Sequence, residues 1–186
     1  MSTEIRQLEP RAVWNKFADL NAVPRPSKKE ERVIAFMKDF GASLSLEVIE
    51  DSVGNVIIKK PATVGMEDRK PIVMQSHLDM VHQKNNETIF DFLTEGIEMH
   101  VEGDWVKAKG TTLGADNGLG VATIMAVLES NDISHPAIEA LFTIDEETGM
   151  TGAMGLKGGL LSGTILLNLD TEEDDEIGVG CAGGID

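Results

Sequence analysis

The stretch FTIDEETGMTGA, residues 142–153, decides the fold that this sequence predicts. It opens as an apolar strand and stops on three consecutive acids, Asp145, Glu146 and Glu147, which a flexible Thr-Gly pair follows. Carboxylates in a row repel one another, and the repulsion grows where a buried strand leaves little water to screen it. A positive partner for these acids is therefore expected at this end of the strand.

Polar residues also follow the other apolar, strand-like runs of the chain. PIVMQS leads into His77 and Asp79, TILLNL leads into Asp170, and the glycine-rich GTTLGAD ends on Asp116 in front of a predicted helix. In open α/β sheets, ligands bind beyond the carboxyl ends of the strands. These four side chains are therefore expected to converge with the acids at 145–147 on one edge of one sheet.

The flanking segments predict helices and hairpins around that sheet. Apolar residues recur at helical spacing in 11–20 and again in 27–44, where Ser27 is a candidate N-cap with Glu30 three residues on. Alternating runs on either side of SVGN and of EGD predict two hairpins. The helix expected after Asn117 has an apolar stripe made of Val121, Ile124, Met125 and Leu128. The order of these elements predicts an α/β fold.

Composition and charge restrict the function further. At 186 residues, with 41% hydrophobic residues and 19 glycines, the chain suits one compact domain. The balance of 16 basic against 32 acidic residues, net −16, repels phosphate backbones and anionic lipid, so neither nucleic acid nor membrane is an expected partner. The single cysteine, Cys181, forms no internal disulfide, and no leader or membrane-length apolar run is found, so a cytoplasmic location is predicted.

The residue types that converge are those of a divalent metal site. Histidine with aspartate and glutamate suits zinc or a similar borderline cation. Because alternate residues of an extended segment point to the same side, Asp79 is expected behind the His77 ring, where it fixes the ring tautomer. Asp116, on a glycine-flanked turn, is the candidate for a carboxylate that bridges two ions.

Adjacent residues at a strand end point in different directions, so Glu146 and Glu147 are expected to differ in role. One binds metal, and the other acts as general base on the water between the ions. Two cations lower the electrostatic cost of gathering these acids and bring the pKa of bound water toward about 7.

Each feature also has a simpler interpretation. A lone histidine in a turn is commonly structural, Asp116 could cap the following helix, and the paired glutamates could face a helix dipole. Asp170 could belong to a solvated acidic loop. GTTLGADNGLG could be a phosphate cradle, but it lacks the Lys and Ser/Thr of a P-loop. The joint occurrence of the motifs favours the metal site.

Taken in order, SHLDMV, GTTLGADNGLG, DEETGMTGA and NLDTEE resemble the co-catalytic di-zinc metallopeptidase family, and within it the aminoacylhistidine (Xaa-His) dipeptidases. HLDMV, KGTTLGADNG and the closing GCAGG carry the likeness to that subfamily. The resemblance covers nearly the whole chain and implies a zinc-exopeptidase-like three-layer α/β/α catalytic domain. The alternatives are a related aminopeptidase or amide deacylase with the same metal cluster, and a non-catalytic metal-binding module.

Carried over residue by residue, the resemblance implies two divalent ions, zinc before cobalt or manganese. His77 and Asp170 would bind one ion, Glu147 would bind the other, and Asp116 would bridge them.

The same resemblance implies metal-dependent hydrolysis of Xaa-His dipeptides. Glu146 would be the general base, and Asp79 would orient His77. The remaining histidines match no ligand position of the family and are expected to be structural or surface residues; they are His82, His100 and His135.

The resemblance also implies residues beyond this sequence. Family members continue through an inserted lid or dimerisation domain and then complete the catalytic domain, where a last histidine binds the second ion. Residues 1–186 would then be the N-terminal part of the catalytic domain, without the lid and the C-terminal part, and are expected to be inactive or nearly so alone. The full-length enzyme is expected to act on a small peptide and to form a homodimer through the lid.

Overall fold

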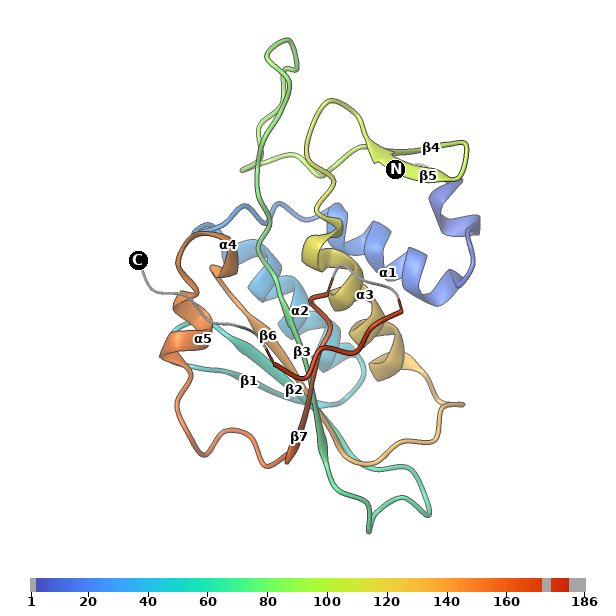
Figure 1. Cartoon of the computed structure of the whole chain (residues 1–186), viewed down its shortest axis with the longest axis vertical. Helices are drawn as coiled ribbons and strands as arrows, with labels where there is room; N and C mark the ends of the chain where they lie inside the picture. Colours follow the sequence, from blue (N-terminus) through green and yellow to red (C-terminus); the bar gives the residue numbers. More distant parts are fainter. Residues whose placement is uncertain (1–2, 172–174, 181–186) are drawn as a thin grey trace.

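A mixed five-stranded sheet lies at the centre of the molecule (Figure 1). The structure is a computed structural model that describes residues 3–171 and 175–180. The strand order is β1-β2-β6-β3-β7. The strands are β1 (Glu47–Glu50), β2 (Val56–Lys60), β3 (Ile72–His77), β6 (Ile138–Thr143) and β7 (Ile165–Asn168). β6, β3 and β7 run parallel, and β1 and β2 form the predicted hairpin around SVGN. The expected strands are therefore confirmed, but β7, which was expected to be a core strand, is an exposed edge strand.

Some of the predicted features lie outside the described residues. They are the acids at 172–174, Cys181, and all of the GCAGG motif except Gly180.

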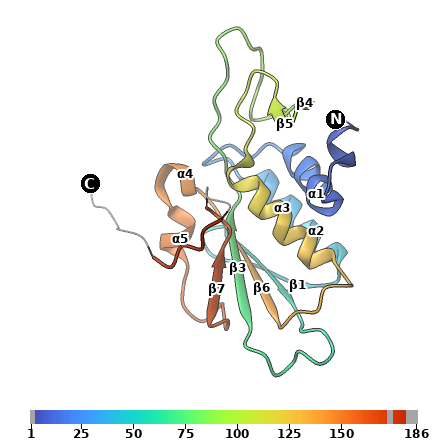
Figure 2. The same ribbon diagram turned by 45° about the vertical axis from the view of Figure 1, so that its right-hand side comes forward.

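Three helices cover one face of the sheet (Figure 2). They are α1 (Arg11–Asn21), α2 (Glu31–Ser43) and α3 (Ala115–Glu129), and a short 3-10 helix, η1 (Ile5–Gln7), precedes α1. The predicted stripe of α3 is buried throughout and packs against Met74, Ala140 and Phe142 of the sheet in the main hydrophobic core. Two helices thus precede the sheet, and both contribute buried side chains to the core, as the apolar periodicity predicts.

The second face of the sheet is covered by two short helices and the segment after them. α4 (Glu146–Gly149) and α5 (Thr151–Gly155) lie across the sheet from α1–α3 in Figure 2. Leu156, Leu160 and Leu161 pack on the buried strand residues Val73 and Leu141. The arrangement has helices on both faces of a sheet, which confirms the predicted α/β/α layers. No helix among the described residues has the length and apolarity of a membrane span.

A separate hairpin lies beyond the carboxyl end of the sheet (Figure 1). Its strands are β4 (Met99–Glu102) and β5 (Trp105–Ala108), and Gly103 makes the turn with a φ of 62°. This confirms the second predicted hairpin. Met99 packs with Ile5 and Phe17, so the hairpin is attached to the N-terminal helices rather than to the sheet.

The predicted capping box at the start of α2 is wrong. The helix begins at Glu31, and no side chain in the described part of the chain caps it. Ser27 Oγ instead donates a hydrogen bond of 2.7 Å to Asp79 Oδ2, and Glu30 Oε1 accepts from the backbone N–H of Asp145 at 3.1 Å. Hydrogen bonds to buried carboxylates are stronger than local caps between neutral groups, so the tertiary partners win.

Candidate metal centre

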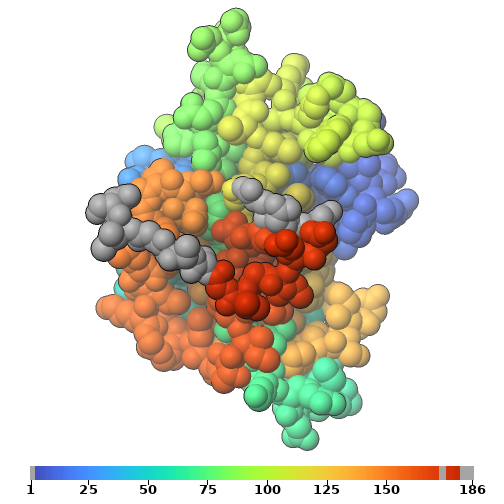
Figure 3. Space-filling view, viewed as in Figure 1, coloured from blue at the N-terminus to red at the C-terminus, as the bar shows by residue number. Residues whose placement is uncertain are grey.

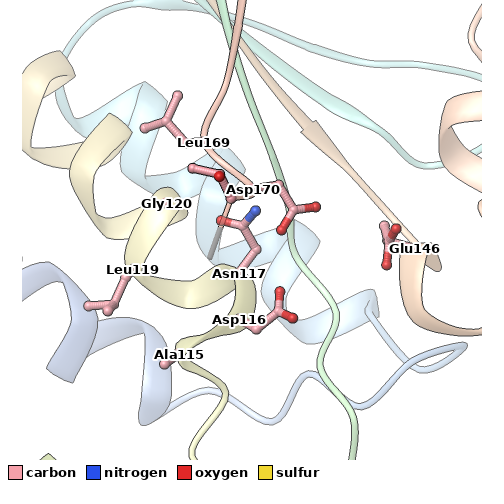
Figure 4. Close-up of a pocket in the computed structure, with 9 residues that line it drawn as sticks. Ala115, Asp116, Asn117, Leu119, Gly120, Glu146, Leu169 and Asp170 are labelled. Atoms are coloured by element: carbon pink, nitrogen blue, oxygen red, sulfur yellow. The ribbon is translucent and has the colours of Figure 1, made fainter. Parts of the chain in front are cut away.

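The polar residues predicted to meet do converge at the carboxyl ends of the parallel strands. His77 ends β3 and pairs in register with Thr143 of β6, and Asp170 comes two residues after β7. Asp116 comes from the first turn of α3, where its φ of −78° and ψ of 118° are not helical, so α3 begins earlier than predicted and contains a kink. Asp116, Glu146 and Asp170 line one pocket of about 560 Å³ and approach one another from three segments (Figure 4).

The His77 ring is the centre of this cluster. Its Nε2 lies 3.1 Å from Asp116 Oδ1, 3.9 Å from Asp170 Oδ2 and 4.0 Å from Glu146 Oε2. Ligand atoms of His77, Asp116 and Asp170 all lie within 4.8 Å of one another. Four of the residues singled out in the sequence thus share one small volume.

Asp79 is fully buried behind the ring. His77 Nδ1 lies 3.1 Å from the carbonyl oxygen of Asp79 and 3.3 Å from its Oδ1, so Nε2 is left to face the pocket. The Asp79 carboxylate also accepts hydrogen bonds from the backbone N–H groups of Glu146, at 3.0 Å, and Glu147, at 3.2 Å. Asp79 therefore joins the histidine to the segment that carries the acids.

The three consecutive acids occupy different environments. Asp145 is buried, has a φ of 52°, and accepts hydrogen bonds from the hydroxyls of Thr148 and Thr151. Glu146 and Glu147 were expected at the end of the strand, but they begin the short helix α4. The turn at Asp145 releases the chain from β6, so that both backbone N–H groups bind Asp79 while the Glu146 carboxylate faces the pocket.

Burial and mutual repulsion keep these carboxylates easy to protonate. Burial raises the pKa of Glu146 and of Glu147, and neighbouring acids raise both further, although His77 opposes them. The pKa of Asp170 is raised for the same reasons. The described residues therefore relieve only part of the repulsion among these carboxylates.

The pKa values of His77 and Asp79, which lie behind the pocket, are shifted so that both groups favour their charged forms. Burial alone would lower the pKa of His77, but its contact with Asp79 and the charges of Asp79, Asp170 and Glu146 raise it to about 9. Burial would raise the pKa of Asp79, but hydrogen bonds from His77, Glu146 and Ser27 lower it to about 2. Asp79 is thus ionised at neutral pH.

The donor set fits a divalent cation. Ligands at about 2.0–2.2 Å from a tetrahedral zinc ion lie about 3.4 Å apart. The distances of 3.1 and 3.9 Å from His77 Nε2 to Asp116 and Asp170 bracket that value. Glu147 is not in this three-residue group, so its role as ligand to a second ion stays a prediction.

Known proteins resemble this chain along nearly its full length. It is 50% identical over 184 residues, 99% of this chain, to the cytosol non-specific dipeptidase of Escherichia coli (strain K12). The crystal structure of aminoacylhistidine dipeptidase from Vibrio alginolyticus matches 92% of this chain with a TM-score of 0.91 and 50% identity. The chain is thus similar to part of each of two dipeptidases. No family model matches the sequence.

Both relatives are much longer than this chain. The chain spans 38% of the E. coli protein and 35% of the V. alginolyticus chain. A more distant solved structure, aminopeptidase PepT from Bacillus cereus, matches 87% of this chain and 43% of its own with a TM-score of 0.73 and 26% identity.

Some residues around this candidate metal centre were not predicted from the sequence. Arg25 is fully buried and contacts the backbone at Asp79, and Glu30 lies with Asp79 and Asp145 in a buried group of carboxylates. The only signals were an arginine between two prolines and an acid before a helix, which are ordinary surface features. Asn117 is also buried beside Asp116, and no hydrogen-bond partner for its carboxamide is found among the described residues.

The other histidines lie outside the cluster, in line with their expected roles. His82 is exposed and stacks edge-on against Phe92, and His100 lies 3.9 Å from Glu102 on the hairpin. His135 is buried and its Nδ1 lies 2.7 Å from the carbonyl oxygen of Pro136.

Proposed function

We propose that this chain carries the metal-binding part of the active site of a cytoplasmic dipeptidase that hydrolyses Xaa-His dipeptides. The observation that carries the proposal is the convergence of His77, Asp116 and Asp170 around one point, with the Glu146 carboxylate 4.0 Å from His77 Nε2. The similarity to two dipeptidases supports the substrate class.

The ligand roles are those that the resemblance to the metallopeptidase family implies. His77 and Asp170 would hold one ion, Asp116 would bridge, and Glu147 would hold a second ion. Zinc is the first choice for a set of one imidazole and several carboxylates, with cobalt or manganese as alternatives. When bound, such cations polarise a carbonyl group and lower the pKa of a coordinated water to about 7.

Glu146 would act as general base. Its carboxylate faces the pocket while its backbone N–H is held by Asp79, so the side chain is free to approach a water molecule in the pocket. Burial raises the pKa of Glu146 from its ordinary value, which brings it closer to the operating pH of a general base. Glu146 would take a proton from the attacking water and later deliver it to the leaving amine.

Metal content tests the site directly. The purified chain should bind close to stoichiometric zinc, and Asp116→Ala should lose most of it, because that variant removes the proposed bridging ligand. Asp104→Ala, which removes an exposed carboxylate from the tip of the hairpin, is the matched control and should keep the metal. Equal zinc content in all three proteins would indicate adventitious binding to the acidic surface and would refute the proposed site.

Turnover separates binding from chemistry. In a catalytically competent form of the protein, Glu146→Gln should retain zinc and lose about 10²–10⁴-fold in kcat on an Xaa-His dipeptide. The same assay with a tripeptide distinguishes a dipeptidase from the aminopeptidase alternative. The 186 residues alone should show little or no turnover, since the second ion would lack a nitrogen ligand among the described residues, and the proposed homodimer and lid belong to the longer protein.

A further inference from the structure

Arg25 is the largest fully buried side chain in the described part of the chain, with an exposure of 1%. It lies in the segment that connects α1 to α2. Its hydrogen-bond acceptors are carbonyl and amide oxygens rather than carboxylates. A buried charge that has no direct ion-pair partner among the described residues is unusual, because its removal from water costs several kcal/mol. A purely structural role would be filled at lower cost by an apolar side chain.

The guanidinium group joins the two segments that carry the histidine and the bridging acid. Nη1 donates to the carbonyl oxygens of Leu78, at 3.0 Å, and Asp79, at 3.3 Å, directly after His77. Nη2 donates to the carbonyl oxygen of Gly114 at 2.6 Å, two residues before Asp116. One planar fork therefore sets the separation of the two backbones.

Asn21 supports the same contact from the end of α1. Its Oδ1 accepts from Arg25 Nη2 at 3.1 Å, and its Nδ2 donates to the carbonyl oxygen of Leu113 at 3.0 Å. The two carbonyl groups that precede Ala115 are thus both held, one by each side chain. The turn that presents Asp116 is anchored from behind rather than by its own sequence.

The glycine-rich segment GTTLGADNGLG makes room for this cation. A Cβ atom at Gly114 would lie 2.5 Å from Arg25 Nη2, and one at Gly118 would lie 2.6 Å from it. Real Cβ atoms do not approach so closely, so larger residues at these positions would displace the guanidinium. The glycines therefore serve a cation contributed by the protein itself.

The charge of Arg25 also faces the acids of the site. Burial lowers the pKa of Arg25 to about 10, while the charges of Asp79, Asp116 and Glu147 raise it. The side chain is therefore still a cation at neutral pH, behind carboxylates that repel one another.

We propose that Arg25 is a positioning residue of the metal centre, which fixes the spacing between the His77 and Asp116 segments and offsets part of their negative surroundings. The proposal rests on the metal site of the proposed function. Residues that orient metal ligands typically change metal affinity by about 10–100-fold when they are replaced. Arg25 should act through affinity for the ion, not only through the stability of the fold.

Zinc affinity of the full 186-residue chain tests the proposal. Dissociation constants would be measured by competition with a chromophoric chelator, at a temperature where circular dichroism shows each variant folded. Arg25→Met removes the fork that sets the ligand spacing and should weaken zinc binding about 10–100-fold, even though loss of the positive charge by itself favours a cation. Arg25→Lys keeps the charge without the fork and should weaken zinc binding at least as much, because the remaining positive charge repels the ion. Arg69→Lys, at an exposed arginine in the β2–β3 connection, is the control and should match the wild type.

Gly118→Ala supplies a second test if Arg25→Met does not fold. It keeps the arginine but displaces Nη2, and it also crowds Phe17, while the alanine improves helix propensity; the chain should remain folded and bind zinc less tightly. Gly158→Ala, where an added Cβ meets nothing within 4 Å, is its control. Wild-type zinc affinity in both Arg25→Lys and Gly118→Ala would overturn the proposal, even though the metal site itself would stand. Absence of zinc binding by the wild type would instead refute the proposed function.

Discussion

A proton and a metal ion compete for Nε2 of His77. In the metal-free protein its pKa is about 9, because the field of Asp79, Asp170 and Glu146 outweighs the effect of burial. At neutral pH the ring therefore carries a proton on each nitrogen, and the Nε2 proton must leave before that nitrogen can bind a cation.

The pH dependence of metal binding follows from that pKa. Zinc uptake at pH 7–8 should release about one proton, and the apparent affinity should rise about tenfold per pH unit until the pH approaches the His77 pKa of about 9, where the rise should level off. Calorimetric titration in buffers with different enthalpies of ionisation measures the protons released. A constant affinity from pH 6.5 to 9 would contradict this account.

Asp79 should make the fold sensitive to acid. Its folded pKa of about 2 is below its ordinary value, so the unfolded chain binds more protons between about pH 4 and pH 2. The stability that Asp79 contributes is present above about pH 4 and is lost as the pH falls toward 2, by an amount of the order of 2 kcal/mol.

Asp79→Asn tests this contribution in the metal-free chain. The variant should be less stable at pH 7, because the donors of Ser27, Glu146 and Glu147 would meet an amide, and it should lose less stability between pH 4 and 2. Urea unfolding at a series of pH values measures both effects. Asp104→Asn should reproduce the wild-type profile, and an unchanged profile for Asp79→Asn would count against a depressed pKa.

At the scale of the elements, the sequence predicted helices and strands correctly where the spacing of apolar residues depends only on which face of the element is buried. The stripe of α3 and the alternation of the two hairpins depend on burial alone, and both were predicted correctly. Ser27 was assigned to a local cap because its tertiary partner, Asp79, is 52 residues away in the sequence. The positions of His77, Asp116 and Asp170 were predictable because strand ends define one edge of a sheet, whereas Arg25 was not, since its partners are backbone atoms without a sequence signal.

The helix pair α4–α5 depends on close contact at Gly152. Its N–H donates to the carbonyl oxygen of Ile144 at 3.1 Å, and its carbonyl oxygen accepts from the buried Asn55 at 2.9 Å. A Cβ at this position would lie 2.3 Å from Asn55 Oδ1 and 2.6 Å from the Ile144 nitrogen. The backbone that carries Glu146 is therefore seated against the β1–β2 turn.

Gly152→Ala should consequently destabilise the chain, by about 1–3 kcal/mol as for other overpacked positions, and should weaken zinc binding by displacing α4. Thermal unfolding with and without zinc measures both. Gly158→Ala, in open space after α5, is the control and should leave both unchanged. A Gly152→Ala protein as stable as the wild type would show that α5 is not packed as described.

At the scale of the whole molecule, the sheet is exposed at the edge formed by β7. β7 is exposed along its length, with exposures of 43% for Ile165, 58% for Leu166 and 43% for Leu167. Leu166 pairs with Val73 and Leu167 with Met74, so apolar side chains are exposed on both faces of the sheet at this edge. The segment that contains β7 forms part of the molecular surface in Figure 3.

This edge should make the 186-residue chain associate with itself. An apolar edge strand offers unpaired backbone groups and apolar side chains to another copy, while the net charge of −16 opposes association at low salt. Raising the salt concentration should therefore increase the apparent mass in sedimentation experiments, because screening removes the repulsion but not the apolar contact. Leu166→Lys should keep the chain monomeric at all salt concentrations, whereas Val64→Lys, at a residue that is 97% exposed in the β2–β3 connection, should not. If Leu166→Lys associated as the wild type does, the contact between copies would lie elsewhere on the surface. The negative charge of the molecule would then be enough to keep β7 of one copy from pairing with another copy.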